Sequence, residues 1–522
     1  MNTLDVHDKN PPLGCSGETG RFISGVGMLT ADRPGLLGRG LNSYIENAAK
    51  HLRQVEYVVF DDSKNPANRH ANLEVARALA RNFKVKIRFA GVDERTRFVR
   101  YLEEFPGISK HVLKNALLSS QGYTLGQNRN ALLLDSVGTL FLCVDDDTVC
   151  TLVAPPSPAA GLEFCAGEDP SEFWCFRDSA EACATASPVD EDLLGAHEVL
   201  LGKTVEEVCR SVPNAHTKDR RLGLLAVRSA DSVVRITLNG LLGDCAWGAP
   251  FGFWHAPMGF LAFQGASLER LISSDEYYRQ TMRSRQVLRI TSSPVLSDAS
   301  FSMLTFWGLD NRALLPPNVP LNRGQDLVFG QLLWKCFSKA VFGHVPLAVV
   351  HDPMAPRRFW NGEIFRSAAG VDCCRLMIEA IALCDLSATR TSPRERLKLL
   401  GVHLMRLADL PGKALGKQLL EQLHLSNRRF AREIVERASQ LQGRGHLYTS
   451  DVFRYCEKVK AAESRGDYWV PLDLRLGGAA WDSEERTQAV LRQFGELLVE
   501  WSDIVEGARQ LRQAGLRLSL PV

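Results

Sequence analysis

The fold class is decided by residues 22–63, FISGVGMLTADRPGLLGRGLNSYIENAAKHLRQVEYVVFDDS. A short apolar run is followed by a turn, by a segment with apolar residues at helical spacing, and by a second apolar run, VEYVVF. Strands that alternate with helices in this way indicate βαβ units and a mainly parallel sheet. We therefore expect an α/β protein whose first two strands lie at 22–30 and 55–60.

The same alternation continues to residue 150. The sequence predicts a helix over 71–83, a strand at 85–90, helices around 94–119 and 126–138, and a strand at 139–144. Ligands of parallel α/β sheets bind beyond the carboxyl ends of the strands. Two of these strand ends carry acidic clusters, Asp61-Asp62 and Asp145-Asp146-Asp147. This placement is the first functional signal in the chain.

The rest of the chain divides by composition. Residues 151–300 are rich in Pro, Gly and aromatic residues, with a strand-like run at 233–242, and they indicate a long insertion. We expect the α/β pattern to return with a strand and turn at 300–315, a helix within 321–342 and a strand at 346–353. Beyond residue 367 the pattern is helical. The sequence thus predicts a flexible leader (1–22), an α/β domain (23–366) and a helical domain (367–522).

Composition excludes several classes of protein. The chain has 522 residues, a net charge of +2 and 45% hydrophobic residues, which argues against a disordered chain and against a dedicated nucleic-acid binder. The 13 cysteines form no CxxC pair, so we expect reduced thiols and no zinc ribbon. No run of eighteen apolar residues occurs, so no membrane span is expected. We expect a cytoplasmic protein.

The acidic triplet suggests a metal site. Asp145 and Asp147 are separated by one residue at the end of an apolar strand. Carboxylates placed in this way can hold Mg²⁺ or Mn²⁺, which prefer oxygen ligands and share their coordination with phosphates. Such an ion neutralises charge that develops on a diphosphate leaving group. The alternative is a solvated acidic turn or a helix cap.

Four motifs occur in order over residues 22–150: TADRP, VEYVVFDDS, GQNRNALLLDSVG and TLFLCVDDD. This series resembles the family 2 type glycosyltransferases of the GT-A fold, in which T-x-N-R-P, D-D-x-S, an R-N pair and D-x-D follow one another. The resemblance implies a Rossmann-type, GT-A-like sheet. It also implies transfer of a sugar from a nucleotide-diphosphate sugar, with UDP as the expected nucleotide.

The resemblance assigns roles to individual residues. Residues beside the nucleotide or donor sugar would be Thr30, Asp32, Arg33, Asp61, Asp62, Arg129, Asn130 and Asp146. Asp145, Asp147 and His351, which follows the strand PLAVV, would hold the metal or the diphosphate. Simpler interpretations remain open: Arg33 as a turn residue before Pro34, Asp61-Asp62-Ser63 as a helix cap, Arg129-Asn130 as a helix start, and His351 as a surface residue.

The resemblance also implies a general base. Asp326 in RGQDLVFG matches the Asp of the family's acidic pair, although Gln325 replaces the Glu. A carboxylate at a helix N-terminus is stabilised as an anion and can take the acceptor proton if it lies within reach. The alternatives are a simple helix cap, or Asp244 as the base if residues 151–300 do not bring Asp326 back to the metal.

Aromatic residues suggest an acceptor surface, since their rings can stack on a sugar or peptide; the candidates are Trp247 and Trp254. The segment MLTFWGLDNRALL resembles the family's acceptor-side strand and turn, which implies that Trp307 and Asp310 face the acceptor. A hydrophobic core around a Gly-rich turn is the alternative interpretation. The acceptor itself, whether a peptide, a glycan or a small metabolite, is not determined by the sequence.

We therefore expect a metal-dependent, inverting glycosyltransferase that uses Mn²⁺ or Mg²⁺, and a homo-oligomer is compatible with the helical C-terminus. A sugar nucleotidyltransferase is a weaker alternative, because the G-x-G-T-R-L loop is absent, and a dehydrogenase is disfavoured because no G-x-G-x-x-G follows a strand. A degenerate transferase that serves as a binding or scaffold protein is the non-catalytic alternative, and Gln325 favours it.

Overall fold

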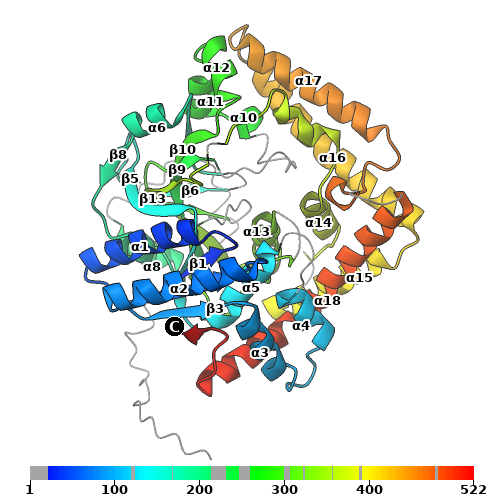
Figure 1. Ribbon diagram of the computed structural model, residues 1–522. Helices are drawn as coiled ribbons and strands as arrows, with labels where there is room; N and C mark the ends of the chain where they lie inside the picture. The colour runs from blue at the N-terminus through cyan, green and yellow to red at the C-terminus, as the bar shows by residue number, and fades with distance from the viewer. Residues whose placement is uncertain are drawn as a thin grey trace, which may run out of the picture.

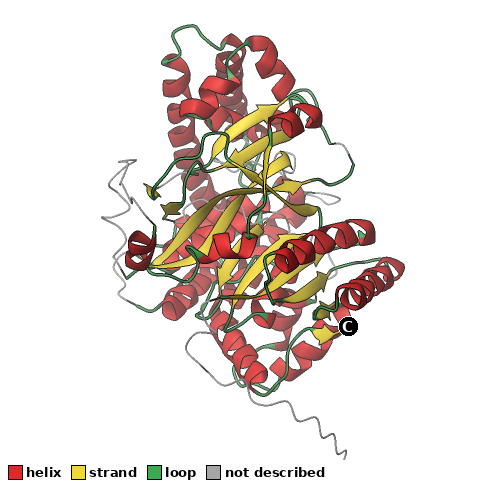
Figure 2. Ribbon diagram, turned by 90° about the vertical axis from the view of Figure 1, so that its left-hand side faces the viewer, coloured by secondary structure: helices red, strands yellow, loops and turns green. Residues whose placement is uncertain are grey.

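The computed structural model describes residues 22–118, 124–166, 169–212, 231–245, 259–298, 306–320, 324–355, 357–386, 391–475 and 480–522. Within these residues a single 14-stranded sheet runs through the molecule, with helices packed on both sides (Figures 1 and 2). The predicted leader lies almost entirely outside the described residues.

The sheet combines two halves. The strands are β1 (Ile23–Thr30), β2 (Glu56–Asp61), β3 (Ile87–Ala90), β4 (Leu140–Asp145), β5 (Thr148–Ala154), β6 (Glu163–Cys165), β7 (Glu172–Phe176), β8 (Ser187–Val189), β9 (Val233–Asp244), β10 (Gln286–Ile290), β11 (Val295–Ser297), β12 (Phe306–Asp310), β13 (Ala340–His351) and β14 (Leu520–Pro521). Their main order is β14-β3-β2-β1-β4-β12-β9-β13-β11-β6, and β5, β7, β8 and β10 attach beside this path.

The helices fall into three groups along the chain. The first group is α1 (Pro34–Lys50), α2 (Pro66–Phe83), α3 (Val92–Leu102), α4 (Lys110–Leu117) and α5 (Leu125–Asp135). The second group is α6 (Ser179–Thr185), α7 (Leu193–Glu198), α8 (Val205–Ser211), α10 (Gly259–Ala262), α11 (Gly265–Leu271), α12 (Asp275–Thr281) and α13 (Gln325–Cys336). The third is α14 (Cys373–Ala382), α15 (Pro393–Ala408), α16 (Gly412–Ser439), α17 (His446–Glu463) and α18 (Ala480–Gln513), with short 3₁₀ helices η2 (Glu363–Ala369) and η3 (Leu472–Leu474).

The parallel half of the sheet is buried on both faces. Strands β3, β2, β1 and β4 pair in parallel, in that order. Along β2 the side chains alternate, so that Val58 and Phe60 join a core with the C-terminal helices, whereas Tyr57 and Val59 join a second core with α1 and α2. Burial on both faces explains why these strands read as continuous apolar runs. The predicted α/β pattern of this half is confirmed.

The segment predicted as an insertion contributes strands to the same sheet. The strands of residues 151–300 extend that sheet, mainly through antiparallel pairs. Strand β12 then inserts between β4 and β9, antiparallel to β4, with Phe306 opposite Val144. The chain therefore returns directly beside the strand that ends in Asp145. Local periodicity could not show this pairing, because it joins segments that are far apart in sequence.

Two helix predictions need correction. The helix expected around 94–119 is two helices, α3 and α4, because the Pro106-Gly107 turn interrupts it and Gly107 has a φ of 80°. The helix expected within 321–342 ends at Cys336, and residues from Ala340 onward already belong to β13. Short apolar segments of this kind satisfy helical and strand patterns equally.

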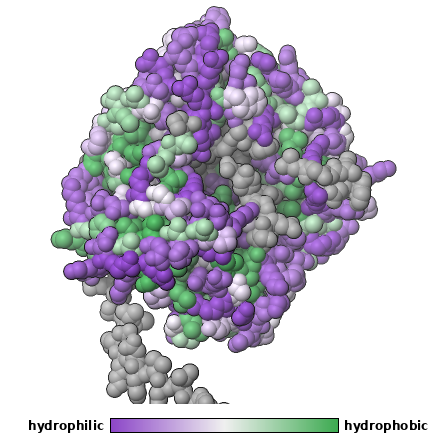
Figure 3. Space-filling view, viewed as in Figure 1, coloured by the Kyte–Doolittle hydropathy of each residue, from purple (hydrophilic) through white to green (hydrophobic). Residues whose placement is uncertain are grey.

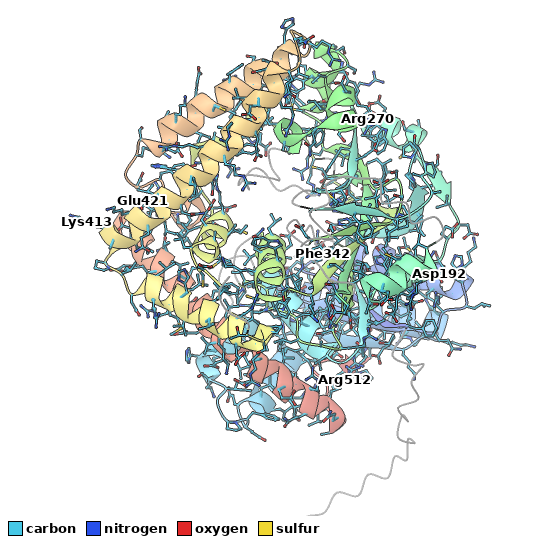
Figure 4. All side chains as sticks on the ribbon, turned by 180° about the vertical axis from the view of Figure 1, so that it is seen from behind. Asp192, Arg270, Phe342, Lys413, Glu421 and Arg512 are labelled. Atoms are coloured by element: carbon cyan, nitrogen blue, oxygen red, sulfur yellow. The ribbon has the colours of Figure 1, made fainter. Side chains whose placement is uncertain are left out.

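The C-terminal region is helical, as predicted. Helices α15 and α18 pack closely, and α16 and α17 form an outer arm on which Lys413 and Glu421 of α16 lie at the edge of the molecule (Figure 4). The final residues form a strand that the sequence did not reveal: β14 pairs with the edge strand β3. Buried Asp135 accepts hydrogen bonds from the Ser519 N–H at 2.9 Å and from Arg517 Nη2 at 2.5 Å, which fixes the chain end.

None of the helices in the described ranges is long and apolar enough to span a membrane. The face of the molecule in Figure 3 carries many hydrophilic side chains and is hollowed near its centre.

Candidate functional site

Three strand ends meet at one edge of the sheet. The register places Thr30 opposite Asp61 and Leu29 opposite Asp145. Backbone hydrogen bonds continue past the strands, from the Asp62 N–H to the Thr30 carbonyl oxygen at 2.9 Å and from the Asp146 N–H to the Leu29 carbonyl oxygen at 3.1 Å. The two acidic motifs therefore flank the same strand end, where parallel α/β sheets bind their ligands.

Arg33 joins two carboxylates of the acidic turn. The turn from β4 to β5 contains Asp146 and Asp147. Arg33 Nη2 lies 2.6 Å from Asp146 Oδ1, and Arg33 Nη1 donates to Asp147 Oδ2 at 3.1 Å. The Thr30 hydroxyl donates to Asp146 Oδ2 at 2.6 Å. Burial nevertheless raises the pKa of Asp146 to about 7. The loss of solvation therefore outweighs the stabilisation that Arg33 gives to the ionised carboxylate.

His351 lies on the other side of Asp147. Its Nε2 is 3.3 Å from Asp147 Oδ1, and its Nδ1–H donates to the Asp244 carbonyl oxygen at 2.6 Å. Burial alone would lower the pKa of His351, but the hydrogen bond and charge of Asp147 raise it. Burial alone would likewise raise the pKa of Asp147, but His351 and then Arg33 hold it well below its usual range. The pair therefore behaves as imidazolium and carboxylate.

Asp145 differs from its two neighbours. Within the described part of the chain no group donates a hydrogen bond to its carboxylate, although the side chain is only partly exposed. Desolvation is the largest influence on Asp145 and raises its pKa to about 6; the charge of Arg129 opposes this shift, and that of Asp147 adds to it. Binding of a cation would stabilise the ionised form of this carboxylate.

The donor set fits a divalent metal. Asp145 and Asp147 supply carboxylate oxygens, which are the ligands that Mg²⁺ and Mn²⁺ prefer. His351, as an imidazolium paired with Asp147, would have to lose a proton before it could bind the same ion. Among the described residues, however, no group of three or more His, Cys, Asp or Glu side chains is arranged around one point to hold an ion. A metal here would take its other ligands from a phosphate and from water, as Mg²⁺ commonly does.

Asp61 and Asp62 have different environments. Asp61 Oδ1 accepts hydrogen bonds from the Ser63 hydroxyl at 2.6 Å and from Asn72 Nδ2 at 2.9 Å, while its buried Oδ2 has no partner. Burial raises the pKa of Asp61. Asp62 Oδ1 pairs with Arg95 Nη2 at 3.0 Å, and the Thr124 hydroxyl donates to Asp62 Oδ2. A buried acceptor without a donor is a feature of binding sites.

Asp32 holds the neighbouring loop. Its carboxylate accepts hydrogen bonds from the backbone N–H groups of Lys64 at 3.1 Å and Asn65 at 3.0 Å, and from Asn68 Nδ2 at 3.2 Å. Its φ of 56° is a left-handed conformation that Asp tolerates better than most residues. Asp32, which lies in the turn after β1, therefore fixes the conformation of the loop after β2 through these hydrogen bonds.

Arg129 and Asn130 both lie in α5 and are buried. Arg129 lies close enough to Asp145 to lower its pKa. Asn130 instead binds the backbone of Asn318, through Nδ2 to the carbonyl oxygen at 3.0 Å and through Oδ1 from the N–H at 2.7 Å. The predicted nucleotide contact of Asn130 is thus replaced by a structural contact, because both ends of its amide are engaged by the protein.

The candidate base, Asp326, lies in the first turn of α13. Asp326 is partly exposed, and Gly324, with a φ of 85°, precedes the helix as its N-cap. Asp326 lies close enough to Cys374 of α14 to raise the pKa of that thiol. The alternative base, Asp244, is buried between two guanidinium groups: Arg285 donates to it at 2.8 Å and Arg357 at 3.0 Å. Asp244 is therefore an anchor for arginines and no longer a candidate base.

The structure does not support the predicted acceptor contacts of Trp307 and Asp310. Trp307 is fully buried and packs edge-to-face on Phe329, with ring centroids 5.1 Å apart. Asp310 is also fully buried, pairs with Arg235 at 2.7 Å, and lies opposite Leu140 at the far end of β4. Trp307 is hidden because its side chain belongs to the hydrophobic core, whereas Asp310 lies at the end of β12 that is remote from the acidic turn. Trp247 and Trp254 lie outside the described residues.

Two site residues were missed by the sequence analysis. Arg95 of α3 reaches both the Asp61 carbonyl oxygen at 2.8 Å and Asp62. Arg357 follows the strand that ends in His351 and contributes to the low pKa of Asp147. Nothing in the local sequence distinguishes Arg95 from the other arginines of its helix. Arg357 had a weak signal, since it lies six residues after His351.

The chain matches no known protein-family model, and no curated protein matches it.

Proposed function

We propose that this chain is a metal-dependent glycosyltransferase with a GT-A-type fold that takes a nucleotide-diphosphate sugar as its donor. One observation carries the proposal: the carboxylates after β2 and the acidic turn after β4 lie on either side of the end of β1. A nucleotide and its metal-bound diphosphate need such a pair of adjacent subsites.

The nucleoside would bind beside β2. Asp61 Oδ2 is an acceptor without a donor, and nucleobases and ribose supply N–H and O–H donors. Arg95 orients Asp62 through its 3.0 Å ion pair. UDP is the nucleotide expected from the resemblance of the sequence motifs.

The diphosphate would bind beside the acidic turn. Asp145 and Asp147 would hold Mn²⁺ or Mg²⁺ with His351 adjacent, and the ion would supply charge neutralisation for the departing diphosphate. Arg33 now balances Asp146 and Asp147 and is 41% exposed, so its guanidinium can turn from these carboxylates to a phosphate oxygen. Arg357, which is 40% exposed, lies on the side of His351.

Asp326 would act as the base. Its position in the first turn of α13 stabilises its anion. In the proposed reaction the acceptor hydroxyl gives its proton to Asp326, and the oxygen attacks the anomeric carbon as the bond to the diphosphate breaks, with inversion.

A second candidate function is nucleotide binding without catalysis. Two observations favour it: Gln325 replaces the acidic residue of the family pattern, and Arg33 already pairs with Asp147, a carboxylate that a metal would use. A binding protein of this kind would hold the nucleotide but would not transfer a sugar.

The test is calorimetric titration with UDP, GDP and CDP, each with and without Mn²⁺. We expect one nucleotide to bind tightly only with Mn²⁺, and this binding to be lost in Asp145→Asn. The matched control is Asp178→Asn, since Asp178 caps α6 and Asn caps a helix equally well. Metal-dependent binding without hydrolysis or transfer of any UDP-sugar would favour the binding protein, and no metal-dependent binding at all would refute the proposal.

A further inference from the structure

Asp244, the last residue of β9, holds three basic side chains in place. Its carboxylate accepts two hydrogen bonds from Arg285, from Nε at 2.8 Å and from Nη2 at 3.0 Å. Arg357 approaches the same two oxygens, with Nε 3.0 Å from Oδ2 and Nη2 2.9 Å from Oδ1. The backbone carbonyl oxygen of Asp244 accepts a further bond from His351 Nδ1 at 2.6 Å. One residue therefore fixes two guanidinium groups and an imidazole.

The two arginines differ in what they can still bind. The Arg285 side chain is 5% exposed and lies over the ring of Phe359, whereas that of Arg357 is 40% exposed. Arg285 by itself gives Asp244 a bidentate partner, which is a strong arrangement of guanidinium and carboxylate. Arg357 is therefore not needed to neutralise Asp244. Its remaining N–H groups have no acceptor within the described part of the chain, so they can bind an anion that arrives from solvent.

The Arg357 guanidinium lies near the carboxylate that would hold the metal. His351 connects the two places, because its Nδ1 is bound to Asp244 and its Nε2 is 3.3 Å from Asp147 Oδ1. Burial would raise the pKa of Asp147, but His351 lowers it, and the charge of Arg357 adds to this lowering. Arg33 approaches the other oxygen of Asp147, Oδ2, at 3.1 Å. Two exposed guanidinium groups therefore flank the same carboxylate.

We propose that Arg357 binds a phosphoryl oxygen of the donor diphosphate, opposite Arg33, and that Asp244 is the positioning residue that holds both Arg357 and His351 for this task. The inference rests on the proposed function, because it needs a diphosphate at the acidic turn. A diphosphate carries several negative charges, of which a divalent ion neutralises only a part. Guanidinium groups supply the remaining charge and the paired N–H donors that phosphate oxygens accept.

A purely structural ion pair is the competing explanation, and the chain contains such a pair for comparison. Asp310 is also buried and also pairs with two arginines, Arg235 at 2.7 Å and Arg312 at 2.7 Å. It lies opposite Leu140, at the end of β4 that is remote from the acidic turn. Variants of this second pair therefore show what the loss of a buried Asp–Arg contact does by itself.

The test uses inorganic pyrophosphate as the probe, titrated by calorimetry into the full-length protein with Mn²⁺. We expect Arg357→Gln to weaken binding by about tenfold, the effect of losing one charged hydrogen bond. Arg357→Lys should recover part of the loss, because Lys keeps the charge but not the planar fork. Asp244→Asn should also weaken binding, because Arg357 is no longer held. Arg235→Gln and Asp310→Asn are the matched controls and should keep the wild-type affinity.

A double variant separates positioning from any other role of Asp244. If Asp244 acts through Arg357, its replacement should weaken pyrophosphate binding only while Arg357 is present, so the double variant should bind no more weakly than Arg357→Gln alone. Asp244→Asn leaves the buried Arg285 without a carboxylate, and thermal unfolding shows whether that variant folds. Asp244→Glu keeps the charge and displaces the carboxylate by one methylene, so it serves for the same comparison. Additive losses would overturn the positioning role.

The diphosphate contact has its own refuting results. Pyrophosphate that binds Arg357→Gln as tightly as the wild type, or that does not bind the wild type, would overturn it. Titration with UDP and Mn²⁺ in the same samples separates this inference from the proposed function. Metal-dependent UDP binding that is insensitive to Arg357→Gln refutes the diphosphate contact alone. Arg357-dependent pyrophosphate binding without binding of UDP, GDP or CDP refutes the glycosyltransferase alone.

Discussion

Replacing Gly495 by Ala should destabilise the joint between α15 and α18. The two helices cross at a pair of glycines, Gly401 and Gly495. A Cβ on Gly495 would lie 2.7 Å from the Gly401 carbonyl oxygen and 2.8 Å from Met405 Cγ. The carbonyl belongs to the backbone of a helix and cannot turn aside, so the helices themselves must separate.

The magnitude follows from two opposing effects. Overpacking costs about 1–3 kcal/mol, and backbone displacement places this site near the upper end of that range. Ala favours a helix over Gly by about 1 kcal/mol, which offsets part of the loss. We therefore expect Gly495→Ala to lower the free energy of unfolding by about 1–2 kcal/mol.

Urea unfolding followed by circular dichroism measures this difference. Gly35→Ala in α1 is the matched control, because no atom lies within 4 Å of a Cβ at that position. Only the helix preference then remains, and the control should gain about 0.5–1 kcal/mol. A Gly495→Ala variant that is as stable as the wild type, or that gains stability as the control does, would refute the close crossing.

Three other predictions concern the site and the chain end. Asp326→Asn should leave metal-dependent UDP binding unchanged in calorimetry and abolish sugar transfer; retained transfer at the wild-type rate would eliminate Asp326 as the base. Arg33→Gln should tighten binding of Mn²⁺ alone, by about tenfold for ~1.4 kcal/mol of lost competition, because the Arg33 guanidinium then no longer competes with the ion for Asp147; unchanged affinity would mean that Asp147 does not hold the ion. Although burial alone would raise the pKa of Asp135, Arg517 lowers it below the usual 3.8. The ion pair of Asp135 therefore stabilises the protein fully above pH 3.8, and this stabilisation is lost as the pH falls through the folded pKa. Asp135→Asn should make the free energy of unfolding depend less on pH between neutral and acid conditions. An unchanged pH dependence would contradict this assignment.

The sequence predicted the candidate site residues well where a local pattern marks their position. The strand ends at Thr30, Asp61 and Asp145 were predictable because an apolar run stops abruptly at a polar residue, and parallel pairing then brings these ends together. The sequence placed Arg33 beside the nucleotide and did not predict its ion pairs with Asp146 and Asp147.

The sequence failed where strand pairing joins distant segments. Trp307 and Asp310 looked like exposed residues after a strand, yet β12 lies between β4 and β9, where both neighbours bury it. The sequence could not identify Arg95 as a site residue for a related reason. Its contact with the Asp61 carbonyl oxygen depends on how α3 packs against the end of β2, and helical periodicity does not reveal which strand a helix packs against.

Helix α5 joins the acidic turn to the segment after β12. Because Phe306 lies opposite Val144, β12 starts at the edge of the sheet that carries the acidic turn and runs away from it to Asp310. Asn318, which follows β12, is held by Asn130 of α5, the helix that also carries Arg129. Desolvation is the largest influence on the pKa of Asp145 and raises it, and the charge of Arg129 opposes this shift. One helix therefore fixes a residue of the segment after β12 and also places a cation near Asp145, so a displacement of α5 would disturb both.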